Sequence, residues 1–159
     1  TGPALQGTES AWAYCGATYR DASLNLLAIR FRGSWMFLEA ALNLLQDGSA
    51  TTETAVLFGV VPSNSSKVYL TLSELGGVSD GAGTLDISIT LRAITGVDYH
   101  TTRAFLTGLG LSSTTFFGAT GVLCPNIAQQ IFYLLTIPTG SGPRTDINLH
   151  AYQLPNGDD

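Results

Sequence analysis

The sequence contains few charged residues for a globular protein. Asp, Glu, Lys and Arg make up 12% of its 159 residues, whereas about 25% is usual. Its hydrophobic content of 45% excludes a disordered chain, because disordered chains combine low hydrophobicity with high charge. A surface of neutral hydroxyl and amide groups suits an extracellular or particle-borne protein. It also suits a protein with one face hidden in an oligomer, where charges would lose their water.

Basic residues and long apolar runs are also scarce. The chain has seven Lys and Arg residues, scattered along its length, and a net charge of −5. No stripe of cations can therefore follow a phosphate backbone, so nucleic acid is not an expected partner. The same net negative charge disfavours binding to anionic membrane surfaces. The longest apolar run, 35–45, is interrupted by Glu39 and Asn43, so membrane insertion is not expected either.

Cysteine is limited to Cys15 and Cys124. Disulfide-dependent secreted domains are much richer in cysteine, and spacing alone cannot show whether these two residues pair. The favoured interpretation is two buried free thiols that act as small hydrophobic residues, with a disulfide as the alternative.

The sequence lacks the patterns that catalysis and metal binding require. Its two histidines, His100 and His150, are not spaced with carboxylates or cysteines as metal ligands are. There is no Gly-x-Ser-x-Gly turn for a nucleophilic serine and no phosphate-binding loop. We therefore expect no enzyme activity, no metal and no cofactor. Four carboxylates are isolated in sequence and are interpreted as solvated: Glu39, Glu53, Glu74 and Asp98.

Alternation of apolar and polar residues predicts strands over 67–73, 85–94 and 145–153. In the last of these, Tyr152 falls on the polar face. Segments 55–61 and 131–137 are apolar on both faces, which predicts fully buried strands. The glycine-rich stretch 76–83 is predicted to be a loop, and 139–143 a turn. Many short strands separated by turns are typical of a sandwich or barrel.

Segment 34–48 is ambiguous. It is rich in helix-forming residues, and Ser34 and Gly48 could cap a helix. A strand is favoured, because 21–32 and 34–45 form two arms of a hairpin about Gly33. That pairing places five residues on one face: Met36, Leu38, Ala40, Leu42 and Leu44. Segment 125–135 has the same ambiguity to a lesser degree. We find no repeat or linker and expect one domain over 1–159.

Candidate binding residues lie in the polar segment 98–103, which is interpreted as a loop. Tyr99, His100 and Arg103 combine a phenol, an imidazole and a guanidinium there, and tyrosine and arginine are enriched in binding hot spots. These three residues are the candidate receptor contacts, although an ordinary polar connection is the alternative. Trp12 and Trp35 are instead interpreted as core or subunit-interface residues.

Three stretches resemble the head domain of an adenovirus fibre. Segment 21–30 leads through Gly33-Ser34 into 35–42, similar to the opening hairpin of that family. Segment 121–126 is similar to its short Gly-Phe-Met-Pro-Asn element, and 146–153 to one of its closing strands. The Thr-Leu-Trp that marks the shaft–head junction of mammalian members is absent, and Ser10-Ala11-Trp12 stands in its place. Within this resemblance, the departure fits a divergent, non-mammalian member of the family.

This resemblance implies an antiparallel β-sandwich that forms a homotrimer on the virion surface, after assembly in the host nucleus. It also implies binding to a host cell-surface receptor, either a protein or a sialylated glycan. Residues 1–10 would then be the end of a preceding shaft. No receptor-contact residue carries over from the family.

Two other functions remain open from the sequence. The chain could be a protruding capsid or spike domain whose partners are other coat subunits. It could also be a small β-sandwich hydrolase or lyase, which would require His100 or His150 to meet an acid in space.

Overall fold

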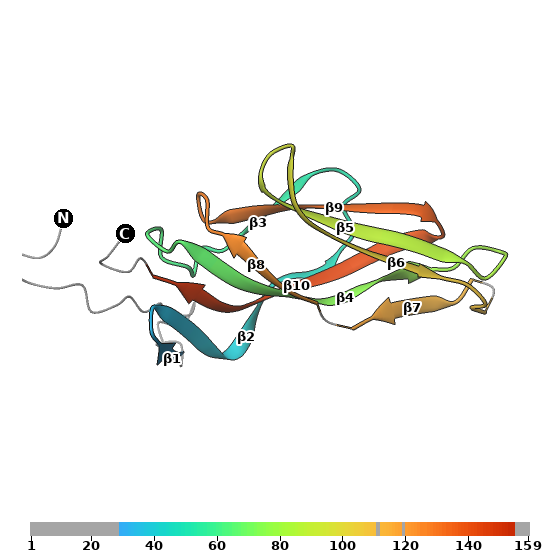
Figure 1. Cartoon of the computed structure of the whole chain (residues 1–159). Coiled ribbons are helices and arrows are strands. Elements are labelled where there is room, and N and C mark those ends of the chain that lie inside the picture. The colour runs from blue at the N-terminus through green and yellow to red at the C-terminus, as the bar shows by residue number, and fades with distance from the viewer. Residues whose placement is uncertain (1–28, 111, 119, 155–159) are drawn as a thin grey trace, which may run out of the picture.

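A computed structural model of the chain describes residues 29–110, 112–118 and 120–154. These residues form antiparallel strands arranged in two sheets that face each other, so the predicted all-β sandwich is confirmed (Figure 1). The strands in chain order are β1 Ile29–Arg32, β2 Trp35–Gly48, β3 Thr54–Leu57, β4 Lys67–Val78, β5 Leu85–Ile94, β6 Val97–Leu106, β7 Thr114–Phe117, β8 Thr120–Pro125, β9 Gln130–Thr139 and β10 Ser141–Gln153.

The two sheets differ in size. The larger has six strands in the order β1-β2-β10-β4-β7, with β8 also paired to β4, and the smaller has four in the order β3-β9-β5-β6. One continuous hydrophobic core fills the space between them, with side chains such as Leu70, Ile89, Leu135 and Leu149 almost fully buried. A core of this kind provides most of the free energy that holds a domain together.

The strand predicted over 85–94 is confirmed as β5, with the same bounds. Its residues alternate as the sequence indicates, with Leu85, Ile87, Ile89 and Leu91 buried in the core. Asp86, on the opposite face, is nevertheless also buried. The strand predicted over 67–73 is confirmed too, and continues as β4 to Val78.

Segment 34–48 is a strand, not a helix. β1 and β2 form the predicted hairpin, with Arg32 opposite Trp35 and Gly33 in the turn at a φ of 60°. β2 pairs with β10 on its other side. These two rows of backbone hydrogen bonds outweigh the local preference for helix. Of the five residues predicted to share a face, Ala40 is exposed and the others contact the core.

The predicted alternation along 145–153 fails at Tyr152. The pairing of β10 with both neighbours shifts between Leu149 and Ala151, which marks a β-bulge. A bulge adds one residue to a strand and so reverses the faces of the residues after it. Tyr152 therefore enters the core, where it is 1% exposed, and Ala151 belongs to the outer face.

Two further strand predictions need correction. Segment 55–61 was predicted to be fully buried, but only Thr54–Leu57 forms a strand, and Leu57 is 66% exposed. β3 lies at the edge of its sheet, so one of its faces meets solvent. In β9, Ile131, Tyr133 and Leu135 are buried, whereas the residues between them are only half-buried.

The predicted loop at 76–83 begins later than expected. Gly76 and Gly77 are buried residues of β4, and the loop starts at Ser79. The predicted turn at 139–143 is reduced to Gly140, at a φ of 107°, between β9 and β10.

Cys124 is a buried free cysteine, as predicted. Burial raises the pKa of its thiol to about 12, because an apolar surrounding disfavours the thiolate. Cys15, Trp12 and the first arm of the hairpin up to residue 28 lie outside the described residues.

Candidate functional site

The three predicted receptor contacts lie on a strand and not on a loop. Tyr99, His100 and Arg103 belong to β6, the edge strand of the four-stranded sheet. Alternation places Tyr99 and Arg103 on the solvent face and His100 on the inner face. His100 is half-buried, and its Nε2 lies 2.9 Å from the hydroxyl of Thr102. The three residues therefore do not form one surface.

Arg103 is held by a carboxylate of the neighbouring strand. Its Nε and Nη2 atoms donate hydrogen bonds of 2.8 and 2.5 Å to the two carboxylate oxygens of Asp86. This two-point pairing lowers the pKa of Asp86 and raises that of Arg103. A guanidinium bound in this way has fewer donors left for a ligand, and the assignment of Arg103 as a receptor contact stays a prediction.

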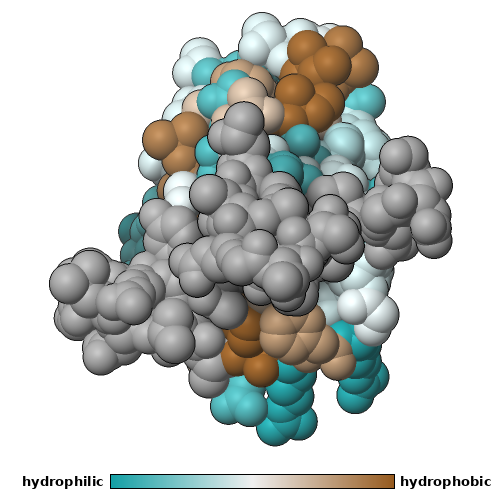
Figure 2. Space-filling view, turned by 90° about the vertical axis from the view of Figure 1, so that its left-hand side faces the viewer, coloured by the Kyte–Doolittle hydropathy of each residue, from teal (hydrophilic) through white to brown (hydrophobic). Residues whose placement is uncertain are grey.

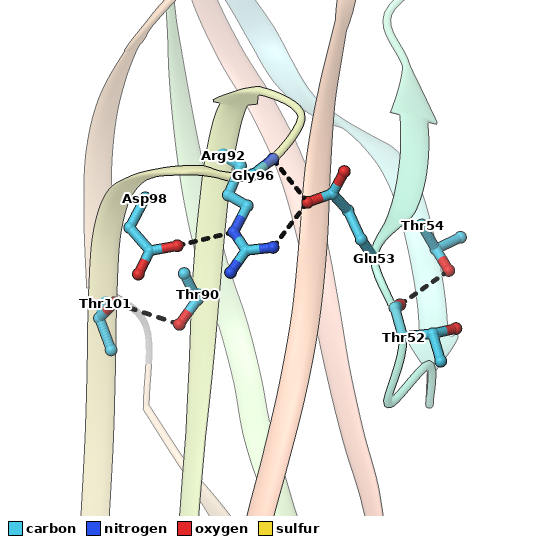
Figure 3. A network of polar contacts seen from close by, with 8 residues as sticks. All are labelled: Thr52, Glu53, Thr54, Thr90, Arg92, Gly96, Asp98 and Thr101. Carbon is cyan, nitrogen blue, oxygen red and sulfur yellow. Dashed lines mark hydrogen bonds and ion pairs between the residues drawn. The ribbon is translucent and has the colours of Figure 1, made fainter.

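A second ionic network fixes the turn between β5 and β6 (Figure 3). Arg92 donates from Nη1 to Glu53 and from Nε to Asp98, both at 2.6 Å. Glu53 also accepts the backbone N–H of Gly96 at 3.0 Å. Asp98 is solvent-exposed as predicted, but the Glu53 side chain is only 18% exposed, so the prediction of a solvated Glu53 was wrong.

These contacts make stability dependent on pH. The hydrogen bond from Arg92 holds the pKa of Glu53 below its ordinary value, and Arg103 does the same for Asp86. Carboxylates whose pKa is lower in the folded state stabilise it above their unfolded pKa, at roughly pH 4–4.5, and lose this contribution as pH falls through the folded pKa. We expect the melting temperature to fall over that acidic range.

Glu53→Gln isolates this effect in thermal melts recorded from neutral to acidic pH. The variant should be less stable than the native chain at pH 7, and the difference should shrink as Glu53 becomes protonated in the native chain. Glu74→Gln, at an exposed position of β4, is the control and should follow the native curve. A difference that stays constant down to acidic pH would contradict the assignment.

The most distinctive surface feature is a hollow on the outer face of the six-stranded sheet. It has a volume of about 330 Å³ and is lined by Trp35, Phe37, Tyr69 and Leu123. These side chains come from β2, β4 and β8. Trp35 is thus neither a core residue nor an isolated surface residue. We call this feature the aromatic hollow.

The pairing of the strands explains why these residues meet. Phe37 lies opposite Ala151, Ala151 opposite Tyr69, and Tyr69 opposite Leu123, so they form one row across four strands. Ala151 is the small member of the row and is fully buried. Its methyl group leaves space between the two rings beside it. The bulge in β10 is what turns Ala151 toward this face.

Tyr69 is positioned by its neighbours. Its ring centroid lies 5.9 Å from that of His150, whose Nε2 is 2.9 Å from the Thr71 hydroxyl. The ring also lies over Gly121, where an added Cβ would come within 3.1 Å of it. The absence of a side chain at Gly121 therefore allows the ring to occupy its observed position.

Two cations stand beside the aromatic hollow. The Arg32 guanidinium lies 5.9 Å from the centroid of the Phe37 ring. Lys67 precedes Tyr69 by two residues on the same face of β4. It lies opposite Gln153 of β10, which in turn lies opposite Trp35 of β2. Among the described residues, Arg30, Arg92, Arg103 and Arg144 each form an ion pair, but neither Arg32 nor Lys67 does.

The opposite sheet has an exposed apolar surface at the same end of the molecule. Leu57 and Ile127 both pair with Gln130, and Ile94 pairs with Val97 in the adjacent turn. All four are exposed, as is Tyr99. In Figure 2, which views this end, brown apolar atoms form separate groups at the upper right, at the left and below the centre. We call these five residues the end patch.

No arrangement typical of a catalytic metal was found in the described ranges. They contain no group of three or more His, Cys, Asp or Glu residues able to hold a metal ion. Nor do they include a helix long and apolar enough to cross a membrane. His150 contacts Thr71 and Tyr69, and His100 contacts Thr102, so the structure gives neither histidine a described carboxylate partner.

Comparisons with known proteins do not place the chain in a family. No model of a known protein family matches the sequence. No curated protein sequence matches it significantly either.

Proposed function

We propose that this chain is the head domain of a viral attachment protein, similar to an adenovirus fibre head. In this role it has no catalytic activity and no cofactor, forms a homotrimer on the virion and binds a host cell-surface receptor, a protein or a sialylated glycan. Three copies of a weak site on one head would raise avidity without any single tight contact.

The observation that carries this proposal is the aromatic hollow. Aromatic residues are enriched in binding hot spots because they bury a large area at a low cost in conformational entropy. Trp35, Phe37 and Tyr69 are held on paired strands, and sites built on strands are more precise than sites on loops. The β-sandwich supplies this rigid support.

Cell attachment tests the proposal. The fluorescently labelled chain should bind receptor-bearing cells saturably, and light scattering should give the mass of a trimer. Trp35→Ala should reduce attachment by about tenfold or more, because it removes one wall of the hollow. Phe105→Ala, which removes an exposed aromatic residue from β6 on the other sheet, is the matched control and should bind within about twofold of the native chain.

Absence of cell binding by the native chain would overturn the proposal, and so would a stable monomer in solution. If Trp35→Ala and Phe105→Ala reduced cell attachment equally, attachment would not depend on the aromatic hollow. Circular dichroism of both variants shows whether they retain the native fold.

A second candidate function is that of a protruding coat domain that contacts other subunits. The end patch favours it, because its five exposed apolar residues lie toward one end of the sheet, and exposed apolar surface is typical of an interface. Such a domain would form large shells or higher assemblies in light scattering, whereas an attachment head would form a discrete trimer.

A further inference from the structure

We propose that the aromatic hollow binds a protein partner through an apolar side chain flanked by acidic residues, and not a glycan. This inference rests on the proposed function, since it names the class of receptor that the same site would take. It follows from the lining of the hollow, the state of its polar neighbours and the charges at its edge.

The lining favours an apolar group. Three aromatic rings and Leu123 surround the hollow, and the Tyr69 hydroxyl and the Trp35 indole N–H are the two polar groups among those side chains. A sugar has hydroxyl groups on most of its carbons. Each hydroxyl that loses water without gaining a partner costs about 1–3 kcal/mol, whereas an apolar side chain incurs no such cost and gains from burial.

Polar side chains that flank Trp35 along the chain and across the sheet are already engaged with one another. Gln153 donates from Nε2 to the Ser34 hydroxyl at 3.1 Å and accepts a hydrogen bond from the Ser66 hydroxyl at 3.4 Å. The backbone N–H of Ser66 is bonded to the Gln153 carbonyl at 2.8 Å. These groups would have to break existing contacts to bind a sugar.

The charges at the edge favour an acidic flank. The chain carries a net charge of −5, yet Arg32 and Lys67 stand beside the hollow without a described acidic partner. Cations at the rim of an apolar site select partners of opposite charge and accelerate their association. An apolar anchor with Asp or Glu on either side matches both features.

The proposal is tested by selecting peptides from a random phage-displayed library on the intact chain. The recovered peptides should share one large apolar residue flanked by Asp or Glu. Synthetic copies should bind with an affinity that falls as salt is added, because rim charges are screened. Replacing the acids of the peptide by Asn and Gln should weaken binding by about tenfold.

Three charge variants locate the contact. Arg32→Glu and Lys67→Glu should each weaken peptide binding by about tenfold, and Arg144→Glu should leave it within about twofold. Arg144 is the matched control, since it is an exposed cation near the far end of β10 from Gln153 and pairs with Asp47. All three positions are exposed, so these changes should not prevent folding.

Several results would overturn the inference. One is that no peptide is selected, or that the selected peptides lack acidic flanks. Another is that all three charge variants lose peptide affinity equally. A third is that the chain binds a glycan array and that Trp35→Ala abolishes this binding. Loss of the trimer in Trp35→Ala would show that a second copy fills the hollow instead. If the native chain, Arg32→Glu and Lys67→Glu attach to cells equally well, only this inference fails. If the native chain does not attach at all, the proposed function fails.

Discussion

Replacing Tyr152 with alanine should lower the free energy of unfolding by about 3–5 kcal/mol, the usual range for removing a large aromatic side chain from a core. Tyr152 is 1% exposed and is among the largest fully buried side chains in the described part of the chain. A domain is stable by only about 5–15 kcal/mol in total. Urea denaturation should therefore show a much lower midpoint.

Tyr99→Ala is the matched control for this prediction. Tyr99 is 48% exposed on β6, and its removal should change the free energy of unfolding by less than about 0.5 kcal/mol. Tyr152→Phe keeps the volume of the ring, so its loss of unfolding free energy should lie between those of Tyr152→Ala and Tyr99→Ala. If Tyr152→Ala and Tyr99→Ala unfold at the same urea concentration, the assignment of Tyr152 to the core is wrong.

The burial of Tyr152 illustrates how far the sequence determines this fold. Alternation correctly predicts β5 and most of β4, because each of these segments contributes one regular face to the core. It fails in β10 because the bulge after Leu149 depends on pairing with two neighbouring strands. Nothing in the local sequence indicates that extra residue.

The edges of the sheets are the second place where the prediction fails. Segment 55–61 is apolar throughout, and a uniformly apolar run is typical of a central, buried strand. The structure places β3 at an edge, so Leu57 is exposed and contributes to the end patch. Whether a strand is central or at an edge is set by the topology of the whole sheet, which a single segment does not encode.

The candidate site was missed for a related reason. The aromatic hollow takes its lining from three strands that are far apart in sequence. Trp35 and Phe37 could have been noticed as neighbours on one strand face, but Tyr69 and Leu123 join them only through the order of β2, β10, β4 and β8. Conversely, 98–103 has a polar composition that resembles a binding loop, and it lies within the edge strand β6.

Ion pairs also show that the presence of an arginine in the sequence does not indicate whether it is available to bind a ligand. Arg103 was singled out because arginine is common in binding sites, whereas its guanidinium is engaged by Asp86. Arg32 lies beside Phe37 and has no acidic partner among the described residues. The availability of a cation for a ligand therefore depends on its neighbours in space.

The glycine at position 76 provides the second large effect on stability. Gly76 lies in β4 opposite Phe116 of β7. A Cβ at this position would lie 2.9 Å from the Cα of Phe116 and even closer to the backbone carbonyl oxygen of Thr115. Backbone atoms cannot move aside as the end of a side chain can, so Gly76→Ala must displace β7.

Gly76→Ala should therefore lower the free energy of unfolding by about 1–3 kcal/mol, the range found for overpacked sites. It should also accelerate hydrogen exchange at the backbone amides of Thr114–Phe117, because pairing with β4 protects that strand. Gly81→Ala is the control, since no atom lies within 4 Å of an added Cβ there. Equal stability of the two variants would mean that β7 does not pack against Gly76. Such a result would reinstate the glycine-rich loop that the sequence predicts at 76–83.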